Sequence, residues 1–496
     1  MEFLSRTLND GCAVINMKNN ACSVPLCIDL DGTLIHSDML HESVLGLIKA
    51  DPLSLFRLPF WLVKGKAEMK QQIAERTEFD PSSLPYNLDF LAWLREQHTA
   101  GRRLILCTAS DRSIANPIAQ HLGFFDEVLA SDGLVNLAGT NKAKALVERF
   151  GEQGFDYAGN SGADLKVWER ARRAIVVNAS NELQNDASAC AEVERVFAGM
   201  SSGVTTWSKL LRVHQWLKNG LLAVPLFAAH GVTDGGAWLS LLLAFVAFSL
   251  CASSVYIAND LLDLESDRQH PRKSKRPFAA GLVPAWKGVL LGPVLLVVSL
   301  LIATLVSPGF LTWLSVYFVL TCIYSFKLKQ LVLVDCLTLA ILYTLRIVAG
   351  AAAVGMVLSF WLLAFSVFLF LSLAFVKRFA ELQMQLLHGK HKAHGRGYFT
   401  DDAPLIQMLG IASGFSSVLV LALYLNSVDV LRLYQNPEWV WGNVPVMLFW
   451  ISWVWLRAHR GEMHDDPLVF AVKDKASIAA GAFFVLFITV GAGGWS

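Results

Sequence analysis

The sequence predicts a multidomain protein in which an N-terminal α/β domain with a helical cap precedes a C-terminal all-α membrane domain of about nine transmembrane helices. Three observations predict this fold class. Of the 496 residues, 54% are hydrophobic and only 17% are charged, whereas soluble proteins carry about 25% charged residues. Long uncharged stretches begin near residue 205 and are absent before it. In the N-terminal part, polar side chains follow short apolar segments, as they do at the strand ends of a parallel sheet.

The C-terminal part contains uncharged stretches that are long enough to cross a bilayer, which takes about 20 helical residues. These stretches are 235–259, 288–326 (interrupted by Pro308-Gly309), 347–376, 403–428, 439–456 and 476–496. A further apolar segment begins near Leu210 and continues to Ala229. From these stretches we expect about nine spans in a domain over 205–496.

Lysine and arginine alternate between the loops of this domain. The loops 259–284, 325–330, 377–402 and 456–475 carry sixteen of them, whereas the intervening connections carry only Arg432. Because cationic loops remain in the cytoplasm, the N-terminal domain is expected there. The sequence therefore predicts a multi-pass protein of the bacterial inner (plasma) membrane, in contact with membrane lipid.

Net charge argues against a nucleic-acid-binding protein, and cysteine spacing argues against a disulfide-rich or zinc-stabilised one. Forty-two basic against forty-one acidic residues leave a formal charge of +1, so no overall positive field attracts nucleic acid. The eight cysteines contain no C-x-x-C pair, which argues against a disulfide scaffold and a structural zinc site.

Three predicted strands of the N-terminal part end in polar groups. The strand at 24–30 delivers Asp29 and Asp31 and is followed by Gly32-Thr33. A strand at 103–107 ends at Thr108, and a strand at 155–158 is followed by Gly159-Asn160 and Asp164, with Lys142 between the last two strands. Such groups meet at one edge of a doubly wound sheet, where ligands bind.

This D-x-D-G-T motif, the hydroxyl-ended strand, the lysine and the final acidic motif resemble the haloacid dehalogenase (HAD) superfamily over 1–200, with a cap at about 37–85. The resemblance implies that Asp29 is the nucleophile that forms an aspartyl-phosphate and that Asp31 is the general acid and base. It implies further that Thr108 and Lys142 bind the phosphoryl oxygens. A Mg²⁺ site would be formed by Asp29, Asp31, Asn160 and Asp164.

One position departs from the family pattern, because Asn160 stands where the family usually has aspartate. Asparagine is a neutral metal ligand, so both a working phosphatase and a slowed or structural domain remain open. The segment 37–85 is interpreted as a cap, as a helical insertion that only packs, or, through its apolar stretch 55–61, as a membrane-interface contact.

An acidic cluster follows the first long apolar stretch. If the helix continues, its members fall within about 100° of one another around the helix axis: Asn259, Asp260, Asp263 and Asp267. Buried carboxylates at the end of a membrane helix are unfavourable unless they bind cations, and Mg²⁺ carried by a diphosphate is the expected partner. The alternative is a solvated acidic loop. The basic run 268–276 either neutralises phosphate or enforces topology.

The N-D-x-x-D-x-x-x-D pattern resembles the UbiA superfamily of intramembrane transferases over 205–496. The resemblance implies that Asp260, Asp263 and Asp267 are catalytic residues that hold Mg²⁺ on a diphosphate leaving group, with Asn259 beside them. Many aromatic prenyltransferases of that superfamily carry a second D-x-x-x-D. Here Asp335 is followed four residues later by Leu339, so a second clamp is incomplete.

Additional polar residues resemble the decaprenyl-phosphate phosphoribosyltransferase branch of the superfamily. The expected substrate- and phosphate-binding residues are Arg212, Lys218, Tyr324, Lys327, Lys329, Asp335, Arg346 and Arg396. A sugar donor with several phosphates and an anionic lipid need such cations. Arg346 and Asp335 share nearly one helix azimuth, which indicates a functional cavity or a structural ion pair. His388, His391 and His394 lie among cations, so no metal is expected there.

The leading hypothesis is a Mg²⁺-dependent transferase that moves 5-phosphoribose from phosphoribosyl diphosphate to a polyprenyl phosphate and releases pyrophosphate. The HAD domain would then remove the 5-phosphate. The first alternative is a UbiA-type aromatic prenyltransferase that uses a polyprenyl diphosphate. The second is a lipid-binding or transport module with a regulatory HAD domain.

Overall fold

The computed structural model describes residues 24–199, 203–270, 272–389, 391, 396–427, 434–463 and 466–493. The chain divides into two compact units. The first comprises residues 1–211 and 257–292, and the second comprises residues 212–256 and 293–496. The segment 257–292, which carries the acidic cluster, therefore belongs to the same unit as the N-terminal α/β domain.

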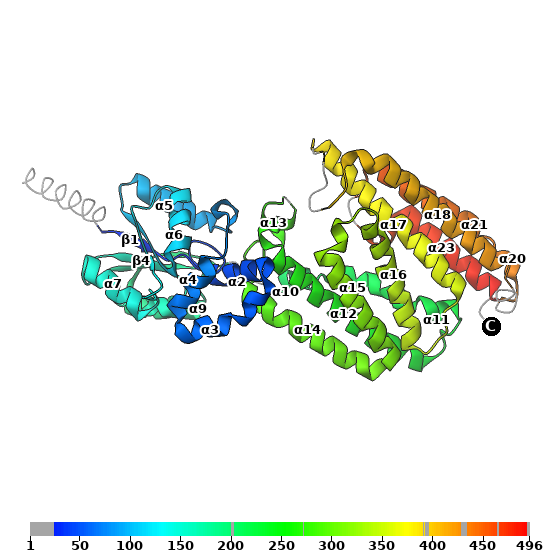
Figure 1. Ribbon diagram of the computed structural model, residues 1–496, viewed down its shortest axis with the longest axis horizontal. Helices are drawn as coiled ribbons and strands as arrows, with labels where there is room; N and C mark the ends of the chain where they lie inside the picture. The colour runs from blue at the N-terminus through cyan, green and yellow to red at the C-terminus, as the bar shows by residue number, and fades with distance from the viewer. Residues whose placement is uncertain are drawn as a thin grey trace, which may run out of the picture. The chain divides into compact units, whose positions relative to one another are not determined.

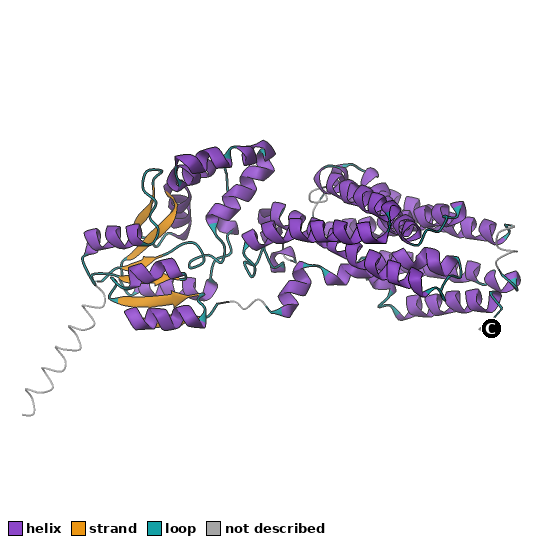
Figure 2. Cartoon of the chain, turned by 90° about the horizontal axis from the view of Figure 1, so that it is seen from below, coloured by secondary structure: helices purple, strands orange, loops and turns teal. Residues whose placement is uncertain are grey.

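The first unit is built on a six-stranded, entirely parallel sheet of order β3-β2-β1-β4-β5-β6. Helices lie around its strands in Figures 1 and 2. Its strands are β1 (Leu26–Ile28), β2 (Leu104–Asp111), β3 (Glu127–Ser131), β4 (Asp156–Gly159), β5 (Arg173–Val177) and β6 (Glu192–Phe197). The chain adds strands β2 and β3 on one side of β1 and strands β4 to β6 on the other, so the order of strands switches between β1 and β4. A crevice forms at the carboxyl ends of the strands on either side of such a switch point. The predicted doubly wound α/β domain is confirmed.

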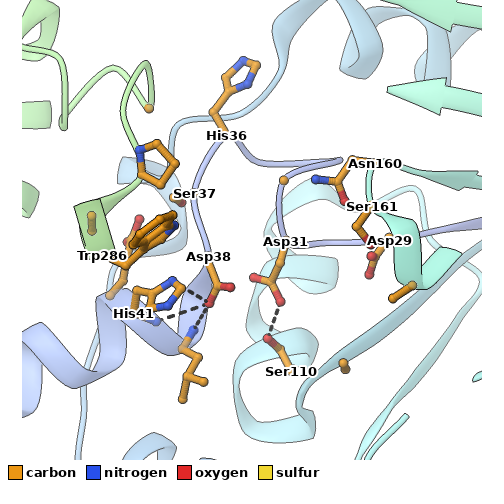
Figure 3. Close-up of a pocket in the computed structure, with 18 of the residues that line it drawn as sticks. Asp29, Asp31, His36, Ser37, Asp38, His41, Ser110, Asn160, Ser161 and Trp286 are labelled. Carbon is orange, nitrogen blue, oxygen red and sulfur yellow. Dashed lines mark hydrogen bonds and ion pairs between the residues drawn. The ribbon is translucent and has the colours of Figure 1, made fainter. Parts of the chain in front are cut away.

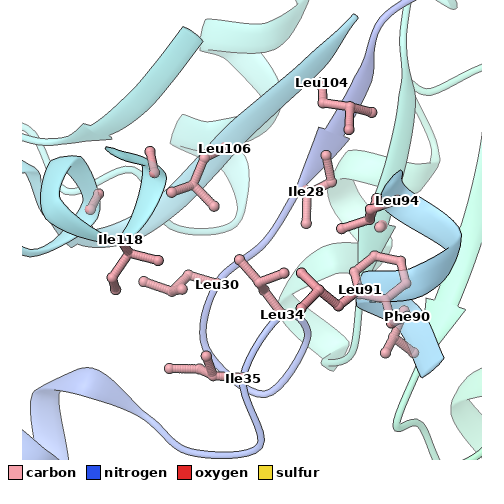
Figure 4. Packing of buried hydrophobic residues seen from close by; sticks show 14 of the residues in the cluster. Ile28, Leu30, Leu34, Ile35, Phe90, Leu91, Leu94, Leu104, Leu106 and Ile118 are labelled. Atoms are coloured by element: carbon pink, nitrogen blue, oxygen red, sulfur yellow. The ribbon is translucent and has the colours of Figure 1, made fainter. Parts of the chain in front are cut away.

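The strands bury alternate side chains on opposite faces, as the two-residue period of a strand requires. Ile28 packs on one face with Leu104 and Phe90 (Figure 4), and Leu26 belongs to the same cluster. On this face lie α5 (Leu88–Thr99) and α6 (Arg112–Leu122), which contribute Leu94 and Ile118 to the same cluster. The opposite face carries Cys27, Ile105 and Cys107 against α7 (Thr140–Phe150), α8 (Leu165–Trp168) and α9 (Asn181–Cys190).

A helical insertion separates β1 from α5, at the position predicted for the cap. It comprises α2 (Met39–Ala50), η1 (Pro52–Phe56), α3 (Leu58–Lys64), α4 (Lys66–Ala74) and η2 (Pro81–Ser83). Phe56 and Phe60 are exposed to 73% and 74%. These two rings do not pack in the hydrophobic core and are exposed, as a contact with the membrane interface would require. The membrane-interface interpretation stays a prediction.

Seven described helices are long and apolar enough to span a membrane. They are α12 (Gly235–Leu262), α14 (Ala285–Val306), α15 (Pro308–Phe326), α16 (Val334–Ala353), α17 (Phe360–Leu387), the segment Thr400–Leu425 that ends in α18 (Ala403–Leu425), and the segment Pro437–His459 formed by α20 (Pro437–Val440) and α21 (Asn443–His459). The shorter α23 (Lys475–Gly491) is also apolar. The chain is an integral membrane protein with an all-α membrane domain, as predicted.

The first apolar segment differs from the predicted single span. It forms α10 (Val204–Leu210), a 3₁₀ helix η4 (Val213–Ala223) and α11 (Val224–Ala228). Arg212 adopts a left-handed conformation with φ of 51°, which L-residues cannot propagate into a right-handed helix. The expectation of nine spans thus becomes seven long helices, the shorter α23 and this broken segment.

Candidate functional site

Two carboxylates lie at the carboxyl end of β1, the strand beside the switch point. Asp29 remains in the sheet, because its N–H donates to the Ala158 carbonyl at 3.0 Å. Gly32 then turns the chain with φ of +74°, a conformation that costs glycine little. Asp29 and Asp31 therefore both line one pocket (Figure 3).

Lys142 contacts both Asp29 and Tyr157 beside this pocket. Its Nζ lies 2.9 Å from Asp29 Oδ1 and donates to the Tyr157 hydroxyl at 2.8 Å. Burial raises the pKa of Asp29 to about 6, although the positive charge of Lys142 opposes this. Lys142 thus stabilises the ionised form of Asp29, the form that a nucleophile needs.

Asp31 accepts two hydrogen bonds, from the Met39 N–H at 2.8 Å and from the Ser110 hydroxyl at 2.7 Å. Burial raises its pKa to about 7, and the negative charge of Asp38 acts in the same direction. A carboxyl group that stays protonated near neutral pH can act as a general acid. Thr108 is fully buried, and its hydroxyl accepts the Ser110 N–H at 3.0 Å.

Asp164 is held by the protein on both of its oxygens. Its Oδ2 accepts the N–H groups of Asn160 and Ser161 at 3.0 and 2.9 Å, and its Oδ1 accepts the Tyr157 hydroxyl at 2.9 Å. These bonds fix the loop that carries Asn160. The Asn160 side-chain oxygen accepts the Thr33 hydroxyl at 3.2 Å.

The oxygens of Asp29 and Asn160 fit a magnesium ion by chemistry, because Mg²⁺ binds oxygen ligands and often takes only one or two carboxylates beside water and a substrate phosphate. Within the described ranges, no three side chains of the His, Cys, Asp and Glu types are arranged to hold a metal by themselves. A Mg²⁺ ion here would depend on the amide oxygen of Asn160 and on the substrate.

The pocket has a volume of about 380 Å³ and three walls. The sheet edge supplies the carboxylates and the cap supplies Lys70, whose Nζ donates to the Ala109 carbonyl at 2.7 Å. The third wall belongs to the segment 264–286, which contributes Arg268 and Trp286. Arg268 donates to both carboxylate oxygens of Glu42, at 2.6 and 2.9 Å.

The acidic cluster of this segment converges on an arginine. Arg276 Nη1 donates to Asp260 Oδ1 at 3.0 Å and to Asp267 Oδ2 at 2.5 Å. Asp260 and Asp267 are buried, whereas Asp263 and Asn259 are half-buried. A guanidinium cation thus occupies the point where two buried carboxylates meet.

The helix that carries the cluster does not continue straight through it. Helix α12 ends at Leu262, and α13 (Leu264–Arg268) begins after Asp263 with φ of −97° and ψ of 14°. Asp267 Oδ1 is buried and accepts no hydrogen bond among the described residues. Lys273 Nζ lies 3.8 Å from it. An unsatisfied buried carboxylate oxygen fits a further cation.

In the second unit, Asp335 is fully buried and surrounded by donors. Arg378 Nη2 lies 2.5 Å from Asp335 Oδ2, and the Tyr398 hydroxyl donates to Oδ1 at 2.5 Å. Arg396 donates to Oδ2 at 3.3 Å and to the Tyr324 hydroxyl at 3.4 Å. Sequence reasoning counted Tyr324, Asp335 and Arg396 among the site residues, but not Arg378 or Tyr398, although Tyr398 lies in the same short stretch as Arg396.

Arg346 has other partners than Asp335. It donates to Asn219 Oδ1 at 3.0 Å, to the Tyr317 hydroxyl at 3.1 Å and to the Leu342 carbonyl at 2.6 Å. Both charged residues lie on α16, but the structure does not bring them together.

Lys218 is buried against an aspartate that sequence reasoning also missed. Its Nζ lies 2.7 Å from Asp466 Oδ2, and Lys377 Nζ lies 3.5 Å from the same atom. The Tyr343 hydroxyl completes the cluster at 3.2 Å. Although burial alone would raise it, Lys377 and Lys218 hold the pKa of Asp466 well below its usual range.

The remaining predicted cations lie outside these clusters. The Arg212 guanidinium lies over the Tyr256 ring at 4.6 Å. Lys327 is exposed and Lys329 is half-buried, next to η6 (Leu328–Gln330). Lys390, Lys392, His394 and Arg432 lie outside the described residues.

Comparison with known proteins assigns families to both parts of the chain. Residues 220–490 match the UbiA prenyltransferase family, and residues 26–169 match the haloacid dehalogenase-like hydrolases. The chain is 41% identical to the uncharacterized protein y4nM of Sinorhizobium fredii, over 92% of this chain and 89% of that protein. It is 34% identical to the nodulation protein NoeC of Azorhizobium caulinodans, over 57% of this chain and 94% of that protein.

A shorter stretch is 40% identical to decaprenyl-phosphate phosphoribosyltransferase of Mycobacterium tuberculosis, over 38% of this chain and 62% of that enzyme. Among solved structures, a UbiA homologue from Archaeoglobus fulgidus bound to GPP and Mg²⁺ superposes with a TM-score of 0.44. It is 16% identical and covers 57% of this chain and 99% of that structure. The two family matches over residues 220–490 and 26–169 confirm both predicted resemblances.

Proposed function

Because the chain belongs to the UbiA prenyltransferase family and carries a haloacid dehalogenase-like domain, we propose that it transfers 5-phosphoribose from phosphoribosyl diphosphate to a polyprenyl phosphate and then hydrolyses the 5-phosphate. The similarity to decaprenyl-phosphate phosphoribosyltransferase supports the choice of substrates. The bacterial inner membrane is the proposed location, with the hydrolase domain in the cytoplasm.

The observation that carries the transferase proposal is the convergence of Asp260 and Asp267 on one cationic nitrogen, with Asp267 Oδ1 still unsatisfied. In this proposal Asp260, Asp263 and Asp267 hold Mg²⁺, which neutralises the pyrophosphate leaving group. Arg276 orients the two buried carboxylates beside the donor. Arg212, Lys218, Lys327, Lys329 and Arg346 are proposed as the cations that bind substrate phosphates.

The surroundings of Asp335 favour phosphoribosyl transfer over aromatic prenyl transfer. A second Mg²⁺ clamp would need carboxylate oxygens that are open to a metal. Asp335 is fully buried, Arg378 forms an ion pair with it, and Tyr398 and Arg396 donate to its two oxygens. Its charge is therefore already compensated by the protein, and we assign Asp335 to positioning Arg396 and Tyr324 for phosphate binding.

The proposed hydrolase step uses Asp29 as the nucleophile towards phosphorus and Asp31 as the acid that protonates the departing sugar oxygen. Lys142 and Thr108 bind phosphoryl oxygens, and Asp29, Asp31, Asn160 and Asp164 form the proposed Mg²⁺ site, with Asp164 acting through the loop that it fixes. Removal of the phosphate makes the transfer effectively irreversible, which explains why the two domains share one chain.

The test uses the purified full-length protein in detergent with Mg²⁺, polyprenyl phosphate and phosphoribosyl diphosphate labelled in the ribose carbon and, separately, in the 5-phosphate. Carbon label should enter the lipid phase, and phosphate label should be released as inorganic phosphate. Asp267→Asn should abolish lipid labelling. Asp234→Asn, at the other end of α12, makes the same charge change and should not.

Absence of lipid label with the wild type would contradict the transferase assignment, and label formation from polyprenyl diphosphate and an aromatic acid would establish the prenyltransferase alternative. If the lipid retained its 5-phosphate in both the wild type and Asp29→Asn, only the hydrolase step would be contradicted.

A further inference from the structure

The phosphatase pocket has an outer wall that does not come from the hydrolase domain. The segment 264–286, between α12 and α14, supplies Arg268, Phe278, Gly281 and Trp286 to the lining. These residues lie more than 90 positions beyond the end of the matched hydrolase region at residue 169. The hydrolase fold by itself therefore leaves the pocket open on this side.

Two contacts attach this wall to the hydrolase domain, one at the cap and one at the turn before it. The Arg268 guanidinium binds both oxygens of Glu42, and the two side chains are only 7% and 12% exposed. Gly281 approaches the turn before the cap so closely that a Cβ added to it would lie 2.4 Å from His36 Cβ. A bidentate, largely buried ion pair and a close backbone approach are specific contacts that hold the wall in place.

The wall brings an aromatic ring to the reacting carboxylates. Trp286 and His41 lie together on one side of the pocket, with Asp38 between them and Asp31 (Figure 3). Trp286 is 43% exposed and Asp38 has a side-chain exposure of 44%. Within one pocket of about 380 Å³ there is thus a ring face for stacking and a carboxylate that can accept hydrogen bonds from hydroxyl groups.

We propose that Asp38, His41 and Trp286 recognise the sugar of a phosphorylated sugar, so that the pocket selects a sugar phosphate over a simple phosphate ester, and that Glu42 and Arg268 are positioning residues for this recognition. The proposal deepens the proposed hydrolase function and rests on it for the orientation of the phosphate towards Asp29. The sugar ring lies against Trp286, and its hydroxyl groups donate to Asp38.

The position of the wall in the chain agrees with this substrate class. Arg268 directly follows Asp267, one of the residues proposed to bind the sugar donor. A lipid-linked product formed at that segment would meet the phosphatase pocket on the side that the same segment builds. A soluble metabolite phosphatase would have no need of a wall from outside its own fold.

Binding measurements test the proposal without depending on turnover. Ribose 5-phosphate and inorganic phosphate are titrated into the full-length Asp29→Asn protein in detergent with Mg²⁺, by calorimetry. Trp286→Ala should raise the ratio of the two Kd values (ribose 5-phosphate over phosphate) about tenfold, the size of one lost aromatic contact, and Trp286→Phe should restore most of the preference. Trp441→Ala, which is equally exposed at 43%, should leave the ratio unchanged.

The ion pair is tested in the same assay. Glu42→Gln and Arg268→Gln should each raise the ratio, and the double variant should raise it no further than either single variant, because both remove one contact. A ratio that Trp286→Ala and the ion-pair variants leave unchanged would overturn the proposal. Turnover separates the two proposals. If the protein hydrolyses ribose 5-phosphate equally well with and without Trp286, only the recognition role is contradicted. If binding depends on Trp286 but no ribose 5-phosphate is hydrolysed, only the phosphatase function is contradicted.

Discussion

Lys142 Nζ lies 2.9 Å from Asp29 Oδ1, and both side chains are buried at the carboxyl end of the central strands. Lys142 comes from the first turns of α7, more than a hundred positions after Asp29. The pair brings a cation to the predicted nucleophile and, through Tyr157, to the loop that Asp164 fixes.

Replacement of Lys142 by methionine should abolish most phosphatase activity. The change removes the cation that lies 2.9 Å from Asp29 and favours its ionised form. It also removes the proposed donor to the phosphoryl oxygens. A loss of about 10² to 10³ in kcat is expected for such a donor. Phosphate release from ribose 5-phosphate measures it. Lys144→Met, an exposed position of the same helix, should retain activity, and equal losses in both variants would contradict the assigned role.

Asn160→Asp should strengthen metal binding at the hydrolase site. The substitution replaces an amide oxygen by a charged one, which hard cations prefer, and the new carboxylate can still accept the Thr33 hydroxyl. The Mg²⁺ concentration for half-maximal hydrolysis should fall about tenfold. Titration of Mg²⁺ into both proteins checks this, and an unchanged midpoint would mean that residue 160 does not bind the ion.

Arg378→Leu should destabilise the membrane domain strongly, because it leaves Asp335 as a buried charge without its closest cation. Breaking a buried pair from one side costs about 3–5 kcal/mol. The double variant Arg378→Leu with Asp335→Leu should be less destabilised than Arg378→Leu alone. Thermal unfolding in detergent gives the order, with the exposed Arg460→Leu as the control. A double variant as unstable as the sum of both changes would show that the residues act independently.

The contribution of Asp466 to the stability of the folded protein should decrease as the pH falls into the acidic range. Its folded pKa lies below that of an unfolded aspartate, so its contribution is fully present above the unfolded value of about 3.9. The contribution is lost as the pH falls below that value towards the folded pKa. Melting temperatures of the wild type and Asp466→Asn should differ at pH 7 and approach each other between about pH 4 and pH 3. A constant difference would contradict this assignment.

The sequence was sufficient for features that depend on local pattern and strand order. Apolar stretches identified the membrane helices, because a bilayer sets their minimum length. The polar residues after three short apolar strands meet in one pocket, because parallel strands end at the same edge of a sheet: Asp29 and Asp31, Ser110 beside Thr108, and Asn160 with Asp164.

Helix periodicity was insufficient for contacts between distant elements. It placed Arg346 and Asp335 at one azimuth of α16, but eleven residues separate them by about 16 Å along the axis, beyond the reach of a shared ion pair. Asp335 instead meets Arg378 from α17. The signal for Arg378 was present, since it lies at the end of a 30-residue uncharged stretch, but its partner depends on helix packing.

The sequence by itself determined that this protein combines a haloacid dehalogenase-like domain with a UbiA-family membrane domain, because motif order and hydrophobic length are properties of the chain. Only the tertiary structure decided where the long-range partners lie: Glu42 with Arg268, Asp466 with Lys218, and Trp286 in the pocket that Asp29 and Asp31 line. The physical reason is that side-chain charge and hydrogen bonding act over a few ångströms, and the fold decides which distant residues come within that distance.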